Sequence, residues 1–265
     1  MTAAGAPFSL DSIREQLTTH TIGRHLVMHG EVDSTNRVAT VLAGSGAPHG
    51  TVVVADRQTQ GRGRLNRTWI SPPGVNLYFS ILLHRLSTFP IIPWLSLFAA
   101  LAVVRAIEHV SSLRGRVKWP NDVIVDRTHP PLKLAGVLAE ATERAVVIGI
   151  GVNVNMAPDA LPPELRSIAT SMLMETGRPV DRGALLARVL CEAEQLYDLE
   201  HPLEEGMSAY RKACSTLGKT VQVTFIAGNQ LEGIAETIAG DGALCLRRPD
   251  GALLEIRAGD VVHLR

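Results

Sequence analysis

Apolar residues along this 265-residue chain follow two patterns, and each pattern predicts one kind of element. Runs that are β-branched or mostly apolar over a few residues predict strands; they lie at 26–32, 51–55, 76–84, 133–140 and 145–154. Residues 117–125 predict two more strands joined by a turn, because Pro120 is incompatible with a helix interior. Helical spacing predicts helices at 9–19, 37–42, 164–175, 181–199 and 202–213. Strands and helices therefore both contribute to the N-terminal part of the chain.

One apolar segment is long enough to raise the question of a membrane. Residues 90–104 carry no charge, but a membrane span needs about 20 such residues. Pro93 lies near the start of this segment, where proline is tolerated in the first turn of a helix. The sequence thus predicts a buried helix over 93–110 and no membrane association.

The pattern changes after Leu217. Short strands separated by glycine- and aspartate-rich turns are predicted at 220–226, 230–238, 243–248, 253–257 and 261–264. Five short strands at this spacing are typical of a small barrel. We therefore expect two domains, 1–217 and 218–265.

Composition narrows the class of protein. Lys plus Arg and Asp plus Glu are both 26, so no overall field attracts nucleic acid or a membrane surface. The three cysteines are odd in number, widely spaced and without a metal-ligand pattern. The first residues lack the basic and apolar regions of a secretory signal. These features indicate a reducing compartment, and we expect a cytoplasmic protein.

Against this neutral background, residues 58–69 concentrate positive charge. Arg62, Arg64 and Arg67 lie in a glycine-rich stretch. Glycine allows backbone N–H groups to approach a ligand closely, and guanidinium groups match phosphate and carboxylate oxygens. The segment predicts a site for a small anion shared between a nucleotide and an acid.

Four other segments carry polar residues between predicted elements, and each has an ordinary structural explanation when taken alone. Residues 33–36 (Asp-Ser-Thr-Asn) are good helix N-caps. The remaining three are a turn at 118–122 (Lys-Trp-Pro-Asn-Asp), a strand start at 133–136 (Lys-Leu-Ala-Gly) and the glycine-rich strand end at 149–153 (Gly-Ile-Gly-Val-Asn).

The order and spacing of these five motifs resemble the biotin–protein ligase family. The resemblance covers most of residues 25–160, and the β-rich tail is similar to the small C-terminal domain of that family. It implies an α+β fold: a mixed β-sheet flanked by helices, related to class II aminoacyl-tRNA synthetases, followed by an SH3-like β-barrel. It also implies an activity. Biotin reacts with ATP to give biotinyl-5′-AMP, and biotin is then transferred to a lysine of a biotin carboxyl-carrier protein.

The resemblance implies particular residues for each part of this reaction. The nucleophile of the first step is already an anion, so placed cations and Mg²⁺ are needed to bring two anions together. The implied catalytic cations are Lys133, Arg64, Arg67 and Lys118. The implied biotin-binding residues are Ser34, Thr35, Asn36, Gln58, Gly61, Arg62, Gly63, Arg64, Lys133, Gly136 and Gly149. The implied ATP-binding residues are Arg64, Arg67, Trp69, Lys118, Asn121 and Asn153, with Asp122 and Asn153 as Mg²⁺ ligands. Residues 60–68 are expected to be mobile without ligand and to order over the adenylate.

Three alternatives compete with this interpretation. Some family members are also DNA-binding repressors, but the 32 residues before Asp33 are too few for a winged-helix domain, so no DNA binding is expected. A lipoate or octanoate ligase is a second alternative, and the Gln58–Arg64 motif with Ser34 and Thr35 favours biotin over it. A non-catalytic adaptor is the third, and it has no need for both Lys133 and the arginine-rich loop. The oligomeric state does not follow from the sequence.

Overall fold

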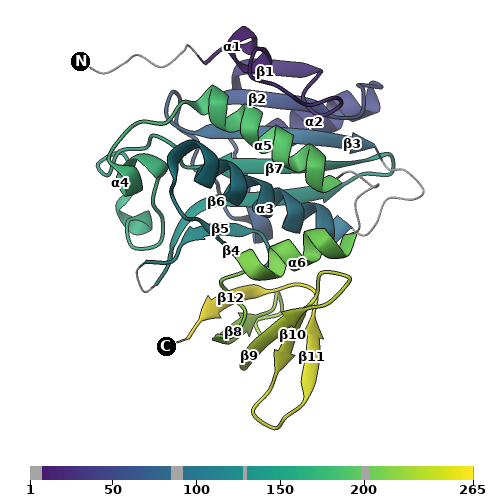
Figure 1. Ribbon diagram of the computed structural model, residues 1–265, viewed down its shortest axis with the longest axis vertical. Coiled ribbons are helices and arrows are strands. Elements are labelled where there is room, and N and C mark those ends of the chain that lie inside the picture. The colour runs from purple at the N-terminus through teal and green to yellow at the C-terminus, as the bar shows by residue number, and fades with distance from the viewer. Residues whose placement is uncertain (1–7, 85–91, 128–129, 198–202, 265) are drawn as a thin grey trace.

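A computed structural model describes residues 8–84, 92–127, 130–197 and 203–264 of the chain. The chain termini fall outside these ranges, and so do the predicted loop at 127–131 in part and the end of the predicted helix at 181–199. Within the described residues, two β-sheets and six α-helices account for the fold (Figure 1).

The large sheet has seven strands in the order β1-β2-β3-β7-β6-β5-β4. Strands β1 and β2 are parallel, and every other neighbouring pair is antiparallel, so the sheet is mixed as predicted. The strands are β1 (Leu26–Val32), β2 (Thr51–Gln58), β3 (Leu77–His84), β4 (Arg116–Lys118), β5 (Asp122–Val125), β6 (Leu132–Ala141) and β7 (Ala145–Val152).

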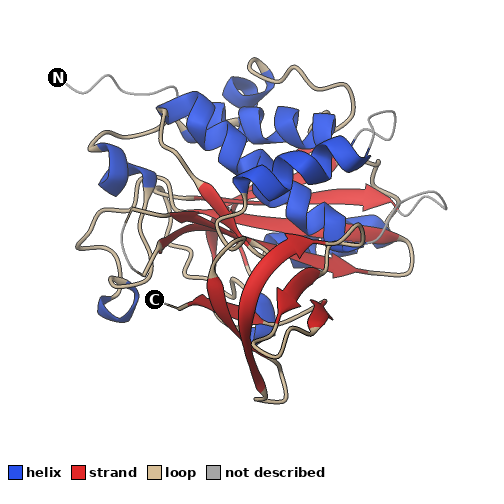
Figure 2. Ribbon diagram, turned by 60° about the horizontal axis from the view of Figure 1, so that its bottom comes forward, coloured by secondary structure: helices blue, strands red, loops and turns tan. Residues whose placement is uncertain are grey.

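Helices cover the two faces of this sheet unequally. The longer helices α3 and α5 lie on one face, and α2 lies on the other (Figures 1 and 2). The α-helices are α1 (Leu10–Arg14), α2 (Thr35–Gly44), α3 (Ile92–Ser111), α4 (Met172–Thr176), α5 (Arg182–Tyr197) and α6 (Leu203–Ala213), with 3₁₀ turns η1 (Arg64–Asn66) and η2 (Pro163–Leu165).

Strand β7 contributes apolar side chains to one face of the sheet and glycines to part of the other face. Side chains alternate between the faces of a strand with a period of two. Val146, Ile148 and Ile150 therefore join the core beneath α3, whereas Val147 packs in a separate cluster with α2. The next positions on the α2 face are Gly149 and Gly151, which lie at and beyond the N-terminal end of α2 and line a cavity.

Helix α3 confirms the prediction of a buried apolar helix. Its segment Pro93–Ser111 is long and apolar enough to cross a membrane by composition, but 67% of it is buried inside the protein. It packs against α5 and against strand β6, so its apolar surface belongs to the core of the molecule.

Two helix predictions were wrong in extent. The helix predicted at 9–19 ends at Arg14, and Glu194 then accepts the backbone N–H groups of His20, Thr21 and Ile22. These bonds hold the following chain away from helical geometry.

The helix predicted at 164–175 is a 3₁₀ turn and a separate short helix. Between them the backbone pairs with β6: Lys133 N donates to Ile168 O at 2.8 Å, and Thr170 N donates to Lys133 O at 2.9 Å. Ser171 then caps α4 by accepting from Met174 N. Pairing with a strand distant in sequence overrides the local helical pattern here.

The second sheet confirms the five predicted strands of the tail. Their order is β11-β10-β9-β8-β12, and all pairs are antiparallel. The strands are β8 (Thr220–Thr224), β9 (Gln230–Ile238), β10 (Leu244–Arg247), β11 (Leu253–Ile256) and β12 (Asp260–His263). Closure into an SH3-like barrel and the boundary at 217/218 stay predictions.

One buried hydrogen bond crosses this proposed boundary: the Trp119 indole N–H donates to Gly242 O, in the small sheet's turn between β9 and β10, at 3.0 Å. The backbone N of Trp119 also donates to Thr216 Oγ1 at 3.0 Å, just before the boundary. Trp119 is 2% exposed and lies in the main core cluster. The large and small sheets therefore share one continuous interior.

We expect Trp119→Phe to lower the free energy of unfolding by about 2 kcal/mol. The substitution removes the indole donor and leaves the buried carbonyl of Gly242 without it, and such a loss costs about 1–3 kcal/mol. Chemical denaturation of the full chain, followed by circular dichroism, measures the change.

Trp94→Phe is the matched control. Its indole nitrogen is buried and has no hydrogen-bond partner among the described residues, so its removal breaks no hydrogen bond described here. A loss of stability in Trp94→Phe equal to that in Trp119→Phe would contradict a role for the bond between the two sheets.

Candidate functional site

A cavity of about 440 Å³ opens on the sheet face that α2 leaves uncovered. The start of α2, the arginine-rich loop, strands β5 to β7, the segment 156–169 and strand β12 all contribute to its wall. Residues separated by more than 200 positions in sequence thus meet around one space.

Three glycines form the floor of the cavity. A Cβ atom on Gly151 would lie 2.5 Å from the indole of Trp69, and one on Gly149 would lie 2.1 Å from the side-chain oxygen of Asn36. Gly136 faces Gly151 across β6 and β7 and would place a Cβ 3.1 Å from Trp69. The bare strands therefore make room for two specific side chains.

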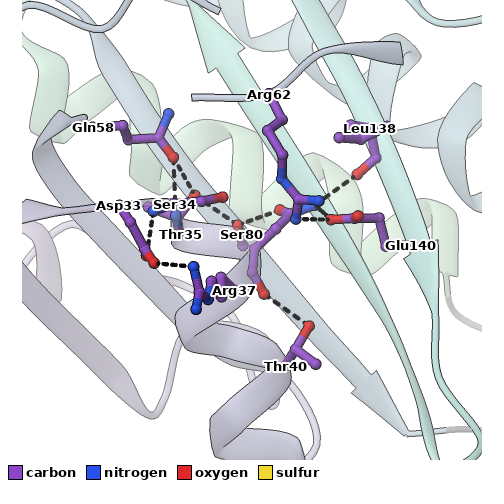
Figure 3. A network of polar contacts seen from close by, with 11 residues as sticks. Asp33, Ser34, Thr35, Arg37, Thr40, Gln58, Arg62, Ser80, Leu138 and Glu140 are labelled. Carbon is purple, nitrogen blue, oxygen red and sulfur yellow. Dashed lines mark hydrogen bonds and ion pairs between the residues drawn. The ribbon is translucent and has the colours of Figure 1, made fainter. Parts of the chain in front are cut away.

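A polar group of residues closes one end of the cavity (Figure 3). Gln58 Oε1 accepts from the backbone N of Thr35 at 2.9 Å, and Ser80 Oγ lies 2.8 Å from Thr35 Oγ1. Asn36 Nδ2 donates to Glu140 Oε2 at 2.7 Å, and Arg62 reaches the same carboxylate oxygen at 3.0 Å. Thr35, Asn36 and Ser80 are buried, so this end can recognise a small polar ligand by hydrogen bonds.

Cations line the middle of the cavity, and each of three has a protein partner. Lys133 Nζ lies 2.7 Å from Asp122 Oδ1 and 5.3 Å from the centre of the Trp69 ring. Arg64 donates to Asn121 Oδ1 at 3.0 Å. Arg67 forms an ion pair with Asp260 of the C-terminal sheet.

Burial makes this cluster receptive to anions. Desolvation is the largest effect on Lys118, and it lowers the pKa of that ammonium against the opposing influence of Asp122. Desolvation also lowers the pKa of Arg64. A polyanion entering the cavity would supply the negative charge that these partly desolvated cations lack.

The residues predicted to bind Mg²⁺ fit that ion. Asp122 lines the cavity with a carboxylate, and Asn153 donates through Nδ2 to Thr170 O, which leaves its side-chain oxygen for a ligand. Mg²⁺ commonly takes one or two protein carboxylates and keeps waters and phosphate oxygens as its other ligands. Among the described residues, no cluster of three His, Cys, Asp or Glu offers a metal cage.

Nearly all residues predicted for the site lie in this one cavity wall. These are Thr35, Asn36, Gln58, Arg62, Gly63, Arg64, Arg67, Trp69, Lys118, Asn121, Asp122, Lys133, Gly136, Gly149 and Asn153. Ser34 and Gly61 are not in the wall: Ser34 is the buried N-cap residue of α2, and Gly61 O accepts from Trp69 N. Their predicted contact with biotin stays a prediction.

Sequence reasoning missed residues on both sides of the cavity. Asp260 and His263 come from the C-terminal sheet, and Glu140 and Ser80 belong to the polar end. Ser80 left a signal, because it interrupts an otherwise apolar run from Leu77 to Leu83. The apolar wall also went unnoticed; it is formed by Met156, Leu161, Leu165 and Ile168.

Two family models match the chain. Residues 30–156 match the biotin/lipoate A/B protein ligase family, and residues 216–264 match the biotin protein ligase C-terminal domain. The first match contains all the predicted site residues, and the second contains the strands of the small sheet.

Similar proteins agree with these matches. The biotin--[acetyl-CoA-carboxylase] ligase of Mycobacterium tuberculosis is 35% identical, over 98% of this chain and 97% of its own length. The bifunctional ligase/repressor BirA of Bacillus subtilis is 40% identical, over 96% of this chain and 78% of its own length. The biotin protein ligase from Aquifex aeolicus, solved in complex with biotin and ATP, has a TM-score of 0.78 and 31% identity, covering 91% of this chain and 99% of that one.

The fold and the site define a ligase that holds an acid beside a nucleotide. The chain belongs to the biotin/lipoate A/B protein ligase family.

Gly151→Ala should weaken nucleotide binding while leaving the fold intact. The new methyl group would meet the Trp69 indole at 2.5 Å, so the indole must move from the floor. Overpacking of this kind costs about 1–3 kcal/mol, which corresponds to a rise in the Kd for ATP of about tenfold or more. Isothermal titration calorimetry measures the affinity.

Gly30→Ala provides the control, because Gly30 also lies in a strand but has no atom within 4 Å of the added methyl group. An unchanged Kd for ATP in Gly151→Ala would show that the placement of Trp69 does not support the nucleotide.

Proposed function

We propose that this chain is a biotin–protein ligase that works in two steps. Biotin and ATP first give biotinyl-5′-AMP and pyrophosphate, and the biotinyl group then passes to a lysine of a biotin carboxyl-carrier protein. One observation supports this most strongly: a buried polar pocket and a cluster of cations share one cavity. The first suits the ring of biotin, and the second suits two anions.

The first step needs charge neutralisation more than it needs a base. The carboxylate of biotin is already a nucleophile, and its approach to the α-phosphorus of ATP is opposed by repulsion between anions. In the proposed complex, Lys133 leaves Asp122 and contacts both the biotin carboxylate and the α-phosphate. Arg64, Arg67 and Lys118 surround the same space. Removal of one placed donor of this kind typically costs about 10²–10³ in rate.

The polar end of the cavity would hold the ureido ring. Thr35 and Asn36 supply a buried hydroxyl and a buried amide there, Gln58 adds a partly buried amide, and Arg62 and Gly63 lie in the same wall. A buried site built around hydrogen bonds rejects an acid that lacks the matching groups by about 10⁴ or more. This end therefore favours biotin over lipoate within the family.

The opposite part of the cavity would hold the nucleotide. Trp69 offers an aromatic face, and its indole nitrogen has no partner among the described residues. The apolar residues Met156, Leu161, Leu165 and Ile168 lie in the same wall. Asp122 and Asn153 would hold Mg²⁺, which supplies neutralisation of phosphate charge when bound.

The second step requires the adenylate to be shielded from water until the carrier arrives. The arginine-rich loop is well placed for this task. Its backbone closes on itself, with Gly63 N donating to Arg67 O at 2.7 Å and Trp69 N donating to Gly61 O at 2.9 Å. Arg67 links the loop to Asp260, so the C-terminal sheet would take part in closure or in carrier docking.

The setting of the reaction belongs to the same proposal. The three free cysteines agree with a cytoplasmic enzyme. DNA binding is not part of the proposed function, because the overall charge is balanced and the cations described above face the cavity.

Exchange of labelled pyrophosphate into ATP tests the first step directly. We expect exchange with biotin and none with lipoate, and we expect Lys133→Ala to reduce it by about 10² or more, because Lys133 would neutralise charge at the reacting atoms. Exchange with lipoate alone would assign the chain to the other branch of its family.

Lys219→Ala is the control for loss of a lysine, since its ammonium pairs with Asp126 away from the cavity wall. We expect it to retain the parent rate. Exchange at the parent rate in Lys133→Ala would refute the role given to Lys133.

Amide hydrogen exchange tests the proposed closure of the loop. When biotinyl-5′-AMP is bound, the exchange rate of the backbone amides of residues 60–68 should fall by about tenfold or more. An added local stability of about 1.4 kcal/mol has that effect. Strand β10 serves as the internal reference. Equal exchange in the free and bound protein would mean that this loop does not order over the intermediate.

A further inference from the structure

Four residues at the polar end form a chain of side-chain hydrogen bonds. Thr35, Ser80, Asn36 and Glu140, here called the relay, come from three different elements, and Figure 3 labels Thr35, Ser80 and Glu140. Gly149 makes the arrangement possible. It pairs with Ser80 on one side and with Leu138 on the other, and the Asn36 amide lies directly over it.

The orientation of Asn36 is fixed from the side of β6. Its two contacts there are Glu140 Oε2 at 2.7 Å and Leu138 O at 3.3 Å. A carboxylate and a carbonyl can only accept hydrogen bonds, so the Asn36 NH₂ group must face them. The Asn36 oxygen therefore points to Ser80 Oγ, 2.6 Å away.

This orientation dictates where each hydroxyl proton lies. A hydroxyl group has one proton. Ser80 must donate it to the Asn36 oxygen, so Ser80 can only accept in its 2.8 Å contact with Thr35. Thr35 then gives its own proton to Ser80 at 2.8 Å in preference to Gln58 Oε1, which lies 3.2 Å from the Thr35 hydroxyl and already accepts from the backbone N of Thr35 at 2.9 Å.

We infer that the Glu140 carboxylate acts through this relay to keep the Thr35 hydroxyl a hydrogen-bond acceptor toward the cavity. The inference rests on the proposed function and deepens it, because it names a specificity device in the biotin pocket. An acceptor at this position selects a ligand that presents an N–H group, such as a ureido ring. Glu140 and Ser80 are positioning residues: they act through Asn36 and Thr35 and are not required to touch the ligand.

Three of the four relay residues are protected from competing water, whereas the Glu140 side chain is 31% exposed. Ser80 is fully buried, and Thr35 and Asn36 are 3% and 4% exposed. Hydrogen bonds in such surroundings are stronger than in water and polarise one another along a chain. A change at Ser80 or Glu140 should therefore reach Thr35.

The test compares biotin with two analogues. In each analogue an oxygen atom replaces one of the two ureido N–H groups, so the ring becomes a cyclic carbamate. The readout is the ratio of KM for analogue and biotin in pyrophosphate exchange, together with kcat and the KM for ATP. In the parent protein we expect one analogue to be rejected by about 10² or more, because its ring oxygen faces a hydroxyl that has no proton to offer.

In Ser80→Ala we expect that ratio to fall by about tenfold or more. The Thr35 proton loses its nearer acceptor at 2.8 Å, and the ring oxygen then competes for it only with Gln58 Oε1 at 3.2 Å, which already accepts from the backbone N of Thr35. The KM for biotin should rise, while kcat at saturating biotin and the KM for ATP stay within about twofold, because the cations of the reaction are untouched. A purely structural defect would not alter the ratio.

Glu140→Gln tests the role of the Glu140 carboxylate, because glutamine has the same shape but carries no charge. It should also lower the ratio, because the amide can donate to Asn36 and no longer forces its orientation. Glu31→Gln is the matched control: Glu31 also pairs with an arginine, at 2.8 Å, but is exposed and makes no contact with the relay. The double variant with Ser80→Ala should change the ratio no more than the stronger single variant.

Each result decides the question. A parent-like ratio in Ser80→Ala or in Glu140→Gln overturns the inference. A change in Glu140→Gln alone would mean that Glu140 acts through Arg62, its other partner. If Ser80→Ala does not fold, Glu140→Gln carries the test. Failure of the parent protein to exchange with biotin would refute the proposed function, whereas exchange with an unaltered ratio refutes only the relay.

Discussion

The ion pair between Lys133 and Asp122 is the interaction on which the site depends. The ammonium lies 2.7 Å from the carboxylate and over the Trp69 ring, so it is held in place before any substrate enters. Arg67 and Arg62 form similar ion pairs with Asp260 and Glu140, respectively. These three cations already have anionic partners, which substrate anions must replace, whereas Arg64 is hydrogen-bonded to the neutral Asn121. Exchange of one partner for another keeps each of these partly exposed cations paired.

The space for that exchange arises because the side chains of strand β7 alternate between the two faces of the sheet. On one face of β7, isoleucine and valine join the core under α3. On the other face, Gly149 and Gly151 leave a bare floor that Asn36 and Trp69 occupy. The helix α2 ends its coverage where the glycines begin, and strand β12 approaches from the C-terminal sheet. The stability of one face and the chemistry of the other thus derive from the same eight residues.

The strands and the buried helix α3 could be predicted from the sequence, because alternation and helical spacing are short-range features. About half of the residues in the cavity wall followed as well, because they lie in the local motifs that resemble the ligase family. The partnerships could not be predicted. Nothing near Arg67 in sequence points to Asp260, and nothing near Asn36 points to Glu140, since both pairs form only when segments distant in sequence meet. The helix predicted at 164–175 failed for the same reason: residues 168–170 pair with Lys133 on β6, and a local pattern carries no information about that strand.

A crystal structure of the full chain with a stable analogue of biotinyl-5′-AMP tests the central claim most directly. The account predicts that Lys133 Nζ leaves Asp122 and lies within hydrogen-bond distance of an oxygen on the phosphate or the acyl group of the analogue, with the ring of biotin at the polar end beside Thr35. A complex in which Lys133 still pairs with Asp122, and the phosphate is held by other groups, would contradict it.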